Sequence, residues 1–237
     1  MPNSTAYSLN EKLHSFVETL DSNELDNYRL LLCRAAGLLA PFENSPVTPT
    51  RDIAFSAVTR SLSDLVPTQL LWRGRRSFID LRYLEALQSE AAEGQSNVLR
   101  YDRHSIGIGG PIADKLARSK ELQSFVYELA PSLRATGVAS YVYYFKPGDG
   151  LEPHVDTEIF SLNVLIMLHH EYIESPSHLV VYPPQQAVQR LLLEPGEVLV
   201  MDAAGLVHGR ESMKRGESLT ILTIGFKPDS LYERTVQ

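Results

Sequence analysis

The sequence predicts an α+β fold in which a helical N-terminal half packs against a C-terminal jelly roll. Two observations predict it. Apolar residues recur at helical spacing up to about residue 135, and short apolar or aromatic strands separated by Pro/Gly turns follow from about residue 138. Strands in such a series close into sandwiches or barrels, and helices can pack on an outer face. We therefore expect one domain over residues 1–237, with residues 1–137 as helical support and lid and residues 138–237 as the jelly-roll core.

The composition is that of a globular protein that works in water. Hydrophobic residues make up 43% of the 237 positions, which is enough to bury a core, and no apolar run is long enough to span a membrane. The net charge of −7 disfavours a nucleic-acid partner, because such binding needs a basic surface. The N-terminus is polar and a single cysteine prevents an internal disulfide. We expect a cytoplasmic protein without membrane or nucleic-acid partners; no pattern indicates an oligomeric state.

The N-terminal half contains five segments with helical periodicity. The predicted helices cover residues 9–17, 25–39, 52–65, 78–92 and 115–133. Asp21 and Glu24 supply capping side chains before the second of them, and the Gly109-Gly110-Pro111 turn opens the last. These helices are the elements that we expect to support the jelly roll.

The C-terminal half contains six predicted strands. They cover residues 140–145, 161–168, 178–182, 189–193, 197–201 and 218–226. Alternation places Asn163, Leu165 and Met167 on one face of the second strand. Adjacent residues face opposite sides of a strand, so His169 and His170 cannot together chelate one metal. We interpret that pair as strand-end residues.

His154 and Asp156 follow a glycine turn directly after an aromatic strand. Residues two apart in a strand face the same side, so both side chains can reach one point. His208, just after the strand at 197–201, is the candidate for a second histidine. Two histidines and one carboxylate suit non-haem iron(II), because they leave positions open for co-substrate and oxygen. A single His-x-Asp is common on protein surfaces, so the whole order of strands, turns and ligands carries this prediction.

That order resembles the iron(II)/2-oxoglutarate-dependent dioxygenase superfamily, particularly its prolyl-hydroxylase-like branch, over residues 138–227. The segments that carry the likeness are Tyr-Tyr-Phe-Lys-Pro-Gly at 143–148, Pro-His-Val-Asp at 153–156, Leu-Glu-Pro-Gly-Glu-Val-Leu-Val-Met at 193–201, His208, and residues 216–226. The resemblance implies a double-stranded β-helix, a distorted jelly roll, with iron(II) held by His154, Asp156 and His208. The presence of Asp156 disfavours a halogenase.

The resemblance also implies the reaction. Its co-substrates would be 2-oxoglutarate and O2, with release of succinate and CO2. The simplest outcome is hydroxylation of an unactivated C–H bond in a small molecule or an amino-acid-like substrate. Thr157 and Glu158, next to the triad, and Arg103, in the sequence of a possible lid, are the candidate substrate contacts.

The chain departs from the family at the last strand. Family members usually place an Arg or Lys there, after a glycine, to hold the distal carboxylate of 2-oxoglutarate. Here Gly216 is followed by Glu-Ser-Leu-Thr. A buried carboxylate without a cation is costly, so another residue should replace the missing one. Arg210 is the candidate, because it shares a strand face with His208; Lys214, Arg215 and Arg103 are the alternatives.

Four neutral side chains are candidate hydrogen-bond partners of the co-substrate: Ser218, Thr220, Asn163 and Tyr143. Asn163 could instead satisfy a neighbouring backbone bulge, and Tyr143 could instead fill an aromatic core.

Three other functions fit the same ligands. The first is hydroxylation of a protein side chain, and the second is a cupin-like metal-binding or sensing protein without turnover. The third is a zinc hydrolase, because ligand type alone does not fix the metal. Iron-dependent release of succinate separates an oxygenase from the last two.

Overall fold

A computed structural model describes residues 70–228, except 132, 157–159 and 184–186, and a few positions between residues 12 and 28. The predicted helices at 9–17 and 25–39 lie mostly outside the described residues, and the one at 52–65 lies wholly outside them. The single-domain prediction therefore stays a prediction. The capping contacts are confirmed: the Asp21 amide donates to the Glu24 carboxylate at 3.0 Å, and the Glu24 amide donates to Asp21 at 2.9 Å.

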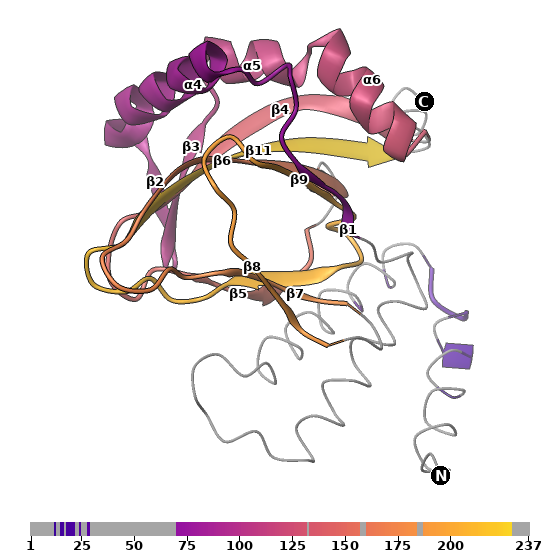
Figure 1. Cartoon of the computed structure of the whole chain (residues 1–237). Helices are drawn as coiled ribbons and strands as arrows, with labels where there is room; N and C mark the ends of the chain where they lie inside the picture. The colour runs from indigo at the N-terminus through magenta and orange to yellow at the C-terminus, as the bar shows by residue number, and fades with distance from the viewer. Residues whose placement is uncertain are drawn as a thin grey trace.

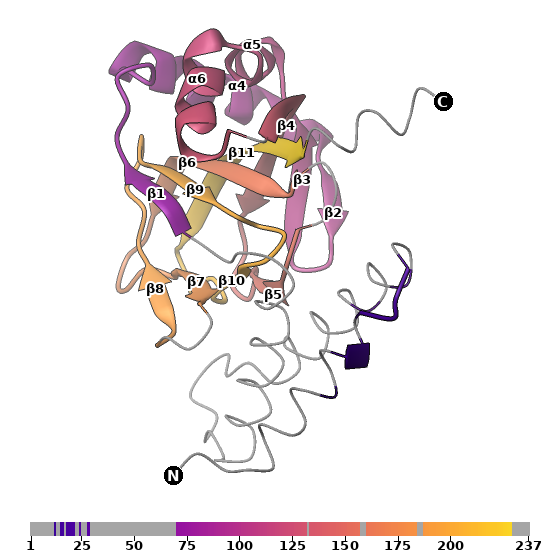
Figure 2. The same ribbon diagram turned by 90° about the vertical axis from the view of Figure 1, so that its right-hand side faces the viewer.

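Two antiparallel sheets face each other (Figure 1). The major sheet has the order β1-β9-β6-β11-β4-β3-β2, and the minor sheet has the order β5-β10-β7-β8. The major strands are β1 (Leu70–Gly74), β2 (Leu99–Tyr101), β3 (His104–Ile108), β4 (Leu133–Tyr144), β6 (Leu162–Glu171), β9 (Val198–Met201) and β11 (Ser218–Pro228). The minor strands are β5 (Leu151–His154), β7 (Leu179–Tyr182), β8 (Gln189–Leu191) and β10 (Val207–Arg210). Figure 2 shows the minor sheet lying across the inner side of the major one, as predicted for a jelly roll.

The helices cover the outer face of the major sheet, on the side away from the minor sheet (Figure 1). They are α4 (Leu81–Gly94), a short 3₁₀ turn (Gln95–Asn97), α5 (Pro111–Ala117) and α6 (Lys120–Leu129). Asp80 caps α4 by accepting the Tyr83 amide at 2.7 Å. The predicted α+β class is thus confirmed. None of the helices in the described part of the chain is both long and apolar enough to cross a membrane.

Glu90 of α4 joins the first two helices. Its carboxylate accepts the amides of Ile112 at 2.6 Å and Ala113 at 3.0 Å, so it caps α5 from a neighbouring helix. Gly110 leaves room for this contact, since a Cβ there would lie 2.5 Å from the Glu90 carboxyl carbon. Pro111 is the first residue of α5, so the helix begins within the predicted turn, four residues before the predicted start at residue 115.

The front half, predicted as mainly helical, also contains strands that the prediction missed. β1, β2 and β3 precede residue 135, and β4 begins at Leu133. These strands pair with partners far along the chain, which the local periodicity could not reveal. The predicted helix at 115–133 is two helices, because the Ser119 hydroxyl accepts the Leu122 amide at 3.3 Å and starts α6.

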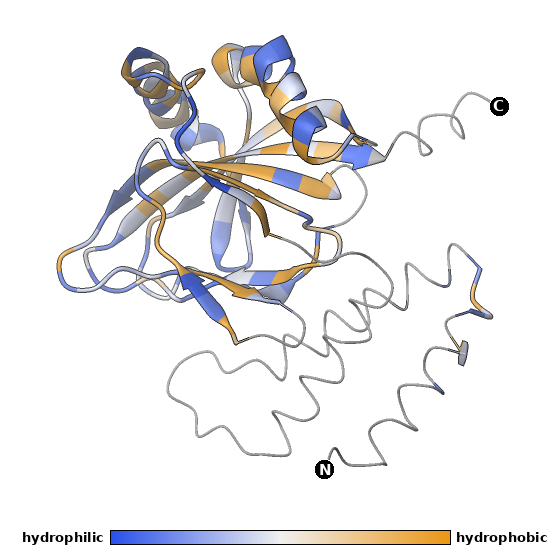
Figure 3. Cartoon of the chain, turned by 45° about the vertical axis from the view of Figure 1, so that its right-hand side comes forward, coloured by the Kyte–Doolittle hydropathy of each residue, from blue (hydrophilic) through white to orange (hydrophobic). Residues whose placement is uncertain are grey.

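The central strands of the major sheet divide their side chains between two cores. On β11, Leu222 and Ile224 pack outward against the helical layer, whereas Leu219 and Ile221 pack inward toward the minor sheet. Figure 3 shows the hydrophobic residues running along the central strands. The interior between the sheets is therefore lined by every second residue of β4, β6, β9 and β11.

One irregularity changes this alternation on β6. Ile221 of β11 pairs with Met167, but Thr220 pairs with His169, so Leu168 is the extra residue of a β-bulge. Met167 faces the interior, and Leu168 packs outward. Beyond the bulge, the His169 side chain is 42% exposed, whereas that of His170 is only 2% exposed. The bulge therefore turns His170 inward.

Candidate metal centre

His154, Asp156 and His208 meet at the edge of the minor sheet. His154 ends β5 and pairs directly with His208 of β10, and the two imidazole centroids lie 4.4 Å apart. Asp156 lies two residues beyond His154, held by its amide donating to the Ala203 carbonyl at 2.7 Å. One ligand atom from each residue lies within 4.8 Å of the others. The three side chains that the sequence predicted as a set do come together.

Both histidines are oriented by their own strands. The Nδ1 of His154 lies 2.8 Å from the Glu152 carbonyl, and that of His208 lies 2.9 Å from the Leu206 carbonyl. A carbonyl accepts only, so Nδ1 carries the proton in each ring and Nε2 keeps its lone pair. The two Nε2 atoms lie 3.3 and 3.8 Å from the same Asp156 oxygen. Their lone pairs thus converge on the carboxylate, as two metal-binding imidazoles require.

Asn163 positions the third ligand. Its side-chain amide donates to the second Asp156 oxygen at 2.9 Å, which leaves the first oxygen for the shared point. Asn163 thus supports Asp156, and its predicted contact with the co-substrate stays a prediction. The Asn163 carbonyl oxygen is buried and has no hydrogen-bond partner among the described residues.

The protonation states favour a metal. Burial lowers the pKa of His208 to about 4, and the charge of His154 acts in the same direction. Burial acts to raise the pKa of Asp156, but His154 and His208 outweigh it and the pKa is lowered. Burial acts to lower the pKa of His154, but Asp156 outweighs it and the pKa is raised. Near pH 7 the site therefore contains an ionised Asp156 and a neutral His208, the protonation states that metal ligands need.

Arg210 lies two residues beyond His208 on the same face of β10. The regular pairing of β10 with β7 keeps the alternation intact between them. Arg210 is 1% exposed, and its Nη1 donates to the Ser177 carbonyl at 3.2 Å. Its Nε and Nη2 have no hydrogen-bond partner in the described part of the chain. A buried guanidinium with free N–H groups is costly unless an anion binds it, so this interior site fits a carboxylate.

Several solved structures resemble this fold. The epimerase SnoN of nogalamycin biosynthesis, described as non-haem and α-ketoglutarate-dependent, has 14% identity and a TM-score of 0.58, over 73% of this chain and 83% of its own. The fold is that of the 2-oxoglutarate-dependent iron(II) oxygenases. A prolyl-4-hydroxylase from Pseudomonas putida matches at 14% identity and TM-score 0.53, over 70% of this chain and 97% of its own. HygX from Streptomyces hygroscopicus, with nickel, 2-oxoglutarate and hygromycin B bound, matches at 12% identity and a TM-score of 0.54, over 72% of this chain and 86% of its own.

No protein-family model and no curated protein sequence matches the chain. The likeness is thus one of three-dimensional structure, and the predicted double-stranded β-helix is confirmed by it. In this oxygenase fold the His-Asp-His cluster and Arg210 both face the space between the two sheets.

Three predicted co-substrate contacts do not face that space. Tyr143 packs outward, and its hydroxyl donates to the Ala91 carbonyl at 2.8 Å. Ser218 and Thr220, with Tyr143, line a groove of about 370 Å³ between α4 and the major sheet. The predicted strand faces were wrong by one residue, because both faces of β4 are aromatic and Ser218 and Thr220 of β11 lie on its outer side.

Tyr144 occupies the interior position that Tyr143 does not. It belongs to the inner core, and its pKa is influenced by both Arg210 and Asp156. Burial raises this pKa to about 12, so the hydroxyl stays protonated and can donate to an anion. His104 of β3 lies beside it, 5.9 Å between centroids, and is 5% exposed. Neither Tyr144 nor His104 was predicted as a site residue. The only signal for them in the sequence is strand alternation, since each lies next to a residue that faces outward.

The other predicted residues lie at the margin of the site. Arg103 forms an ion pair with Glu152, two residues before His154, and donates to Ser212 at 3.2 Å. Lys214 is exposed and its ammonium contacts Ser175, so it is not an interior cation. Thr157 and Glu158 lie outside the described residues.

Proposed function

We propose that this protein is a non-haem iron(II)- and 2-oxoglutarate-dependent oxygenase that oxidises a C–H bond of a small molecule. The observation that carries the proposal is the convergence of His154, Asp156 and His208 within 4.8 Å, with the unpartnered Arg210 on the same strand face. A facial set of two histidines and one carboxylate is the ligand set of such enzymes. The structural neighbours bound to iron or nickel and α-ketoglutarate support the same reading.

Each residue has a distinct task. His154 and His208 would bind iron(II) through Nε2 and Asp156 through the oxygen that Asn163 leaves free. Two residues of strand span about 6.6 Å, so Arg210 lies one short dicarboxylate away from the metal ligand His208. Arg210 would bind the distal carboxylate of 2-oxoglutarate, and the Tyr144 hydroxyl would add a neutral hydrogen bond. The bound metal, 2-oxoglutarate and O2 supply the oxidising chemistry, with release of succinate and CO2.

The surroundings separate the chemistry from water. Leu165, Met167 and Val181 are buried around the interior, which strengthens electrostatic contacts there and excludes solvent. The His154 side chain is 30% exposed, so the triad is reached from the rim on its side. Arg103 at this rim, together with Thr157 and Glu158 after Asp156, would meet the substrate.

A small-molecule substrate is favoured over a protein. SnoN acts in nogalamycin biosynthesis and HygX was solved with hygromycin B. Hydroxylation of a small or amino-acid-like molecule is the simplest outcome of this site. The similarity to a prolyl-4-hydroxylase keeps a protein side chain as the second candidate. A peptide substrate would release succinate only when a matching peptide is present.

The test is an anaerobic titration of iron(II) and 2-oxoglutarate into the protein, followed by the weak visible absorption band of their chelate. We expect the band in the wild type and its loss in His154→Ala. His178→Ala is the matched control, because His178 pairs with Glu211 at 2.9 Å, away from the triad. Iron binding without the band would refute the oxygenase and favour the metal-sensing or hydrolase alternatives.

A further inference from the structure

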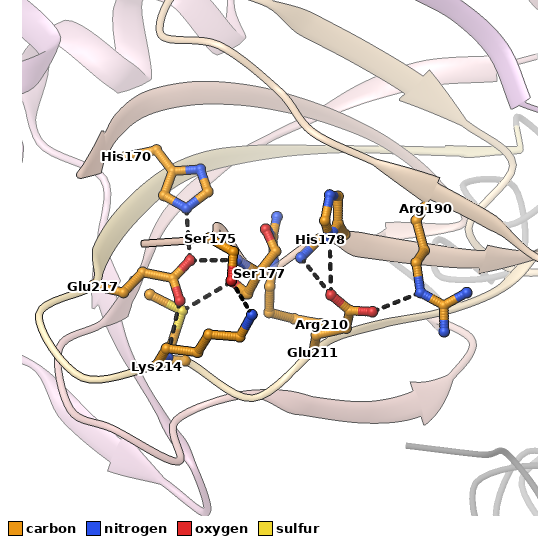
Figure 4. Close-up of polar contacts among 10 residues, drawn as sticks. His170, Ser175, Ser177, His178, Arg190, Arg210, Glu211, Lys214 and Glu217 are labelled. Atoms are coloured by element: carbon orange, nitrogen blue, oxygen red, sulfur yellow. Dashed lines mark hydrogen bonds and ion pairs between the residues drawn. The ribbon is translucent and has the colours of Figure 1, made fainter. Parts of the chain in front are cut away.

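A buried acid–histidine pair lies in the interior beyond Arg210 (Figure 4). Glu217 is 3% exposed, and one of its oxygens accepts the His170 Nε2–H at 2.8 Å and the Ser177 amide at 2.6 Å. The other oxygen accepts the Lys214 amide at 2.9 Å. These donors hold Glu217 as a carboxylate: burial acts to raise its pKa, but the hydrogen bonds outweigh burial and lower it.

Glu217 is connected to Arg210 through a single residue. The Ser177 amide donates to Glu217, and the Ser177 carbonyl accepts from Arg210 Nη1 at 3.2 Å. The charge of Glu217 also acts on the pKa of Arg210, opposing the effect of burial. The charge of Arg210 is therefore already balanced by its neighbour Glu217.

This balance matters when a second carboxylate enters. Binding the distal carboxylate of 2-oxoglutarate next to Arg210 and Glu217 would leave one uncompensated negative charge in the interior. An uncompensated buried charge costs several kcal/mol, on the order of the desolvation penalty per ion. A proton taken up by a neighbouring group would remove this cost.

His170 is the group placed to take up that proton. Its Nδ1 is buried and has no hydrogen-bond partner among the residues described. With Nε2–H donated to Glu217, a neutral His170 presents only a bare lone pair at Nδ1, which cannot bind a carboxylate. The imidazolium would present an N–H donor at Nδ1 while keeping the bond to Glu217.

His170 is neutral before the anion arrives. Burial lowers its pKa, and the charge of Arg210 adds to this effect. Glu217 and Glu194 act in the opposite direction but do not outweigh burial. The Tyr172 ring, at 5.2 Å between centroids, is the aromatic neighbour. A further carboxylate close by would raise the pKa of His170, because it favours the charged form.

We propose that His170 takes up one proton from solvent when the distal carboxylate of 2-oxoglutarate binds Arg210, so that the anion enters the interior together with its compensating charge. The inference rests on the proposed function and adds a pH dependence to its co-substrate site. No bond besides N–H is made or broken: neutral His170, one proton and the free carboxylate become an imidazolium–carboxylate pair. His170 is thus a residue of the co-substrate site, on the interior side of the Leu168 bulge.

The experiment is calorimetric titration of 2-oxoglutarate into the anaerobic iron(II)-loaded protein at pH 7.5, in buffers of different ionisation enthalpy. We expect an uptake approaching one proton per bound 2-oxoglutarate in the wild type. Titration with 2-oxobutyrate, which keeps the chelating end but lacks the distal carboxylate, should show no uptake. Between the pKa of His170 in the free protein and its higher pKa in the complex, the Kd for 2-oxoglutarate should rise by about tenfold per pH unit, and above the pKa in the complex it should level off.

The chain supplies a matched pair of variants. His170→Asn should bind 2-oxoglutarate more weakly and without proton uptake, whereas His169→Asn, one residue away on the outer face, should behave as the wild type. A nitrogen NMR measurement of His170 in zinc-substituted wild-type protein, with and without 2-oxoglutarate, needs no variant. It should show a neutral ring becoming an imidazolium.

The outcomes separate the two proposals. Binding of 2-oxoglutarate without proton uptake, or uptake that survives in His170→Asn, would overturn the role of His170 and leave the oxygenase standing. Absence of both the chelate band and any 2-oxoglutarate binding would overturn the oxygenase, and His170 with it.

Discussion

The two sides of the major sheet differ in whether their buried polar atoms have hydrogen-bond partners. On the outer face, polar atoms are paired within the protein: Tyr143 donates to the Ala91 carbonyl and Tyr141 donates to Glu90. On the inner side, several are not. Over the described part of residues 70–228, the buried side-chain atoms without a partner belong to interior residues: His104, Asn163, His170 and Arg210. Buried polar atoms are normally hydrogen-bonded, so unpaired ones gathered on one side indicate a place for a ligand.

The largest effect expected of this contrast is on metal affinity. His208→Ala removes a direct ligand and should weaken iron(II) binding by at least about a hundredfold, since loss of a supporting residue alone costs about 10- to 100-fold. Asn163→Ala should weaken iron(II) binding within that range of about 10- to 100-fold, because it removes only the hydrogen bond that positions Asp156. Competition titration against a chelating dye measures both, and equal affinities for His208→Ala and wild type would remove His208 from the centre.

The next effect separates two arginines of the minor sheet. Arg210→Ala should weaken 2-oxoglutarate binding by about 3 kcal/mol, or roughly 150-fold, because a buried charge pair loses one partner. Arg190→Ala is the control: Arg190 is half exposed and pairs with Glu211 at 2.7 Å. The Kd of Arg190→Ala for 2-oxoglutarate should stay within about twofold of the wild-type value. A similar loss in both variants would mean that Arg210 acts through the stability of the sheet.

Two adjacent tyrosines compare the faces within one strand. Tyr144→Phe should raise the Kd for 2-oxoglutarate about tenfold, the value of one hydrogen bond to a charged group, and leave stability almost unchanged. Tyr143→Phe should leave that Kd unchanged and lower the free energy of unfolding by about 1 kcal/mol, through its lost bond to Ala91. Calorimetry and urea unfolding of both variants test this prediction. The reverse pattern would show that the two faces of β4 have been assigned wrongly.

The sequence was sufficient for those parts of the site that depend on local spacing. His154 and Asp156 are two residues apart, as are His208 and Arg210, and the regular pairing of β10 with β7 keeps His208 and Arg210 on one face. The sequence could not predict which face of β4 points to the interior, because Tyr143 and its neighbour Tyr144 are chemically alike.

Two further features depend on pairing partners that no local pattern reveals. On β11 the polar Ser218 and Thr220 suggested an interior lining, but Leu219 between them and Ile221 after them fill the interior. The inward turn of His170 depends on the bulge at Leu168, which is defined by register against β11. The strands of the front half were missed for the same reason.

The smallest expected effect concerns the outer face alone. Glu90 accepts hydrogen bonds from Tyr141 and from two amides of α5, and burial, which acts to raise its pKa, is outweighed by these bonds. Because the folded-state pKa is lowered, this stabilisation is present above the pKa of the unfolded chain and is lost as the pH falls through the folded value. Glu90→Gln should therefore lower the free energy of unfolding by about 1 kcal/mol at pH 7, with the difference from wild type shrinking in acid. Urea unfolding across this pH range measures it. The Kd for 2-oxoglutarate should not change, and a change would show that the two faces are coupled through the sheet.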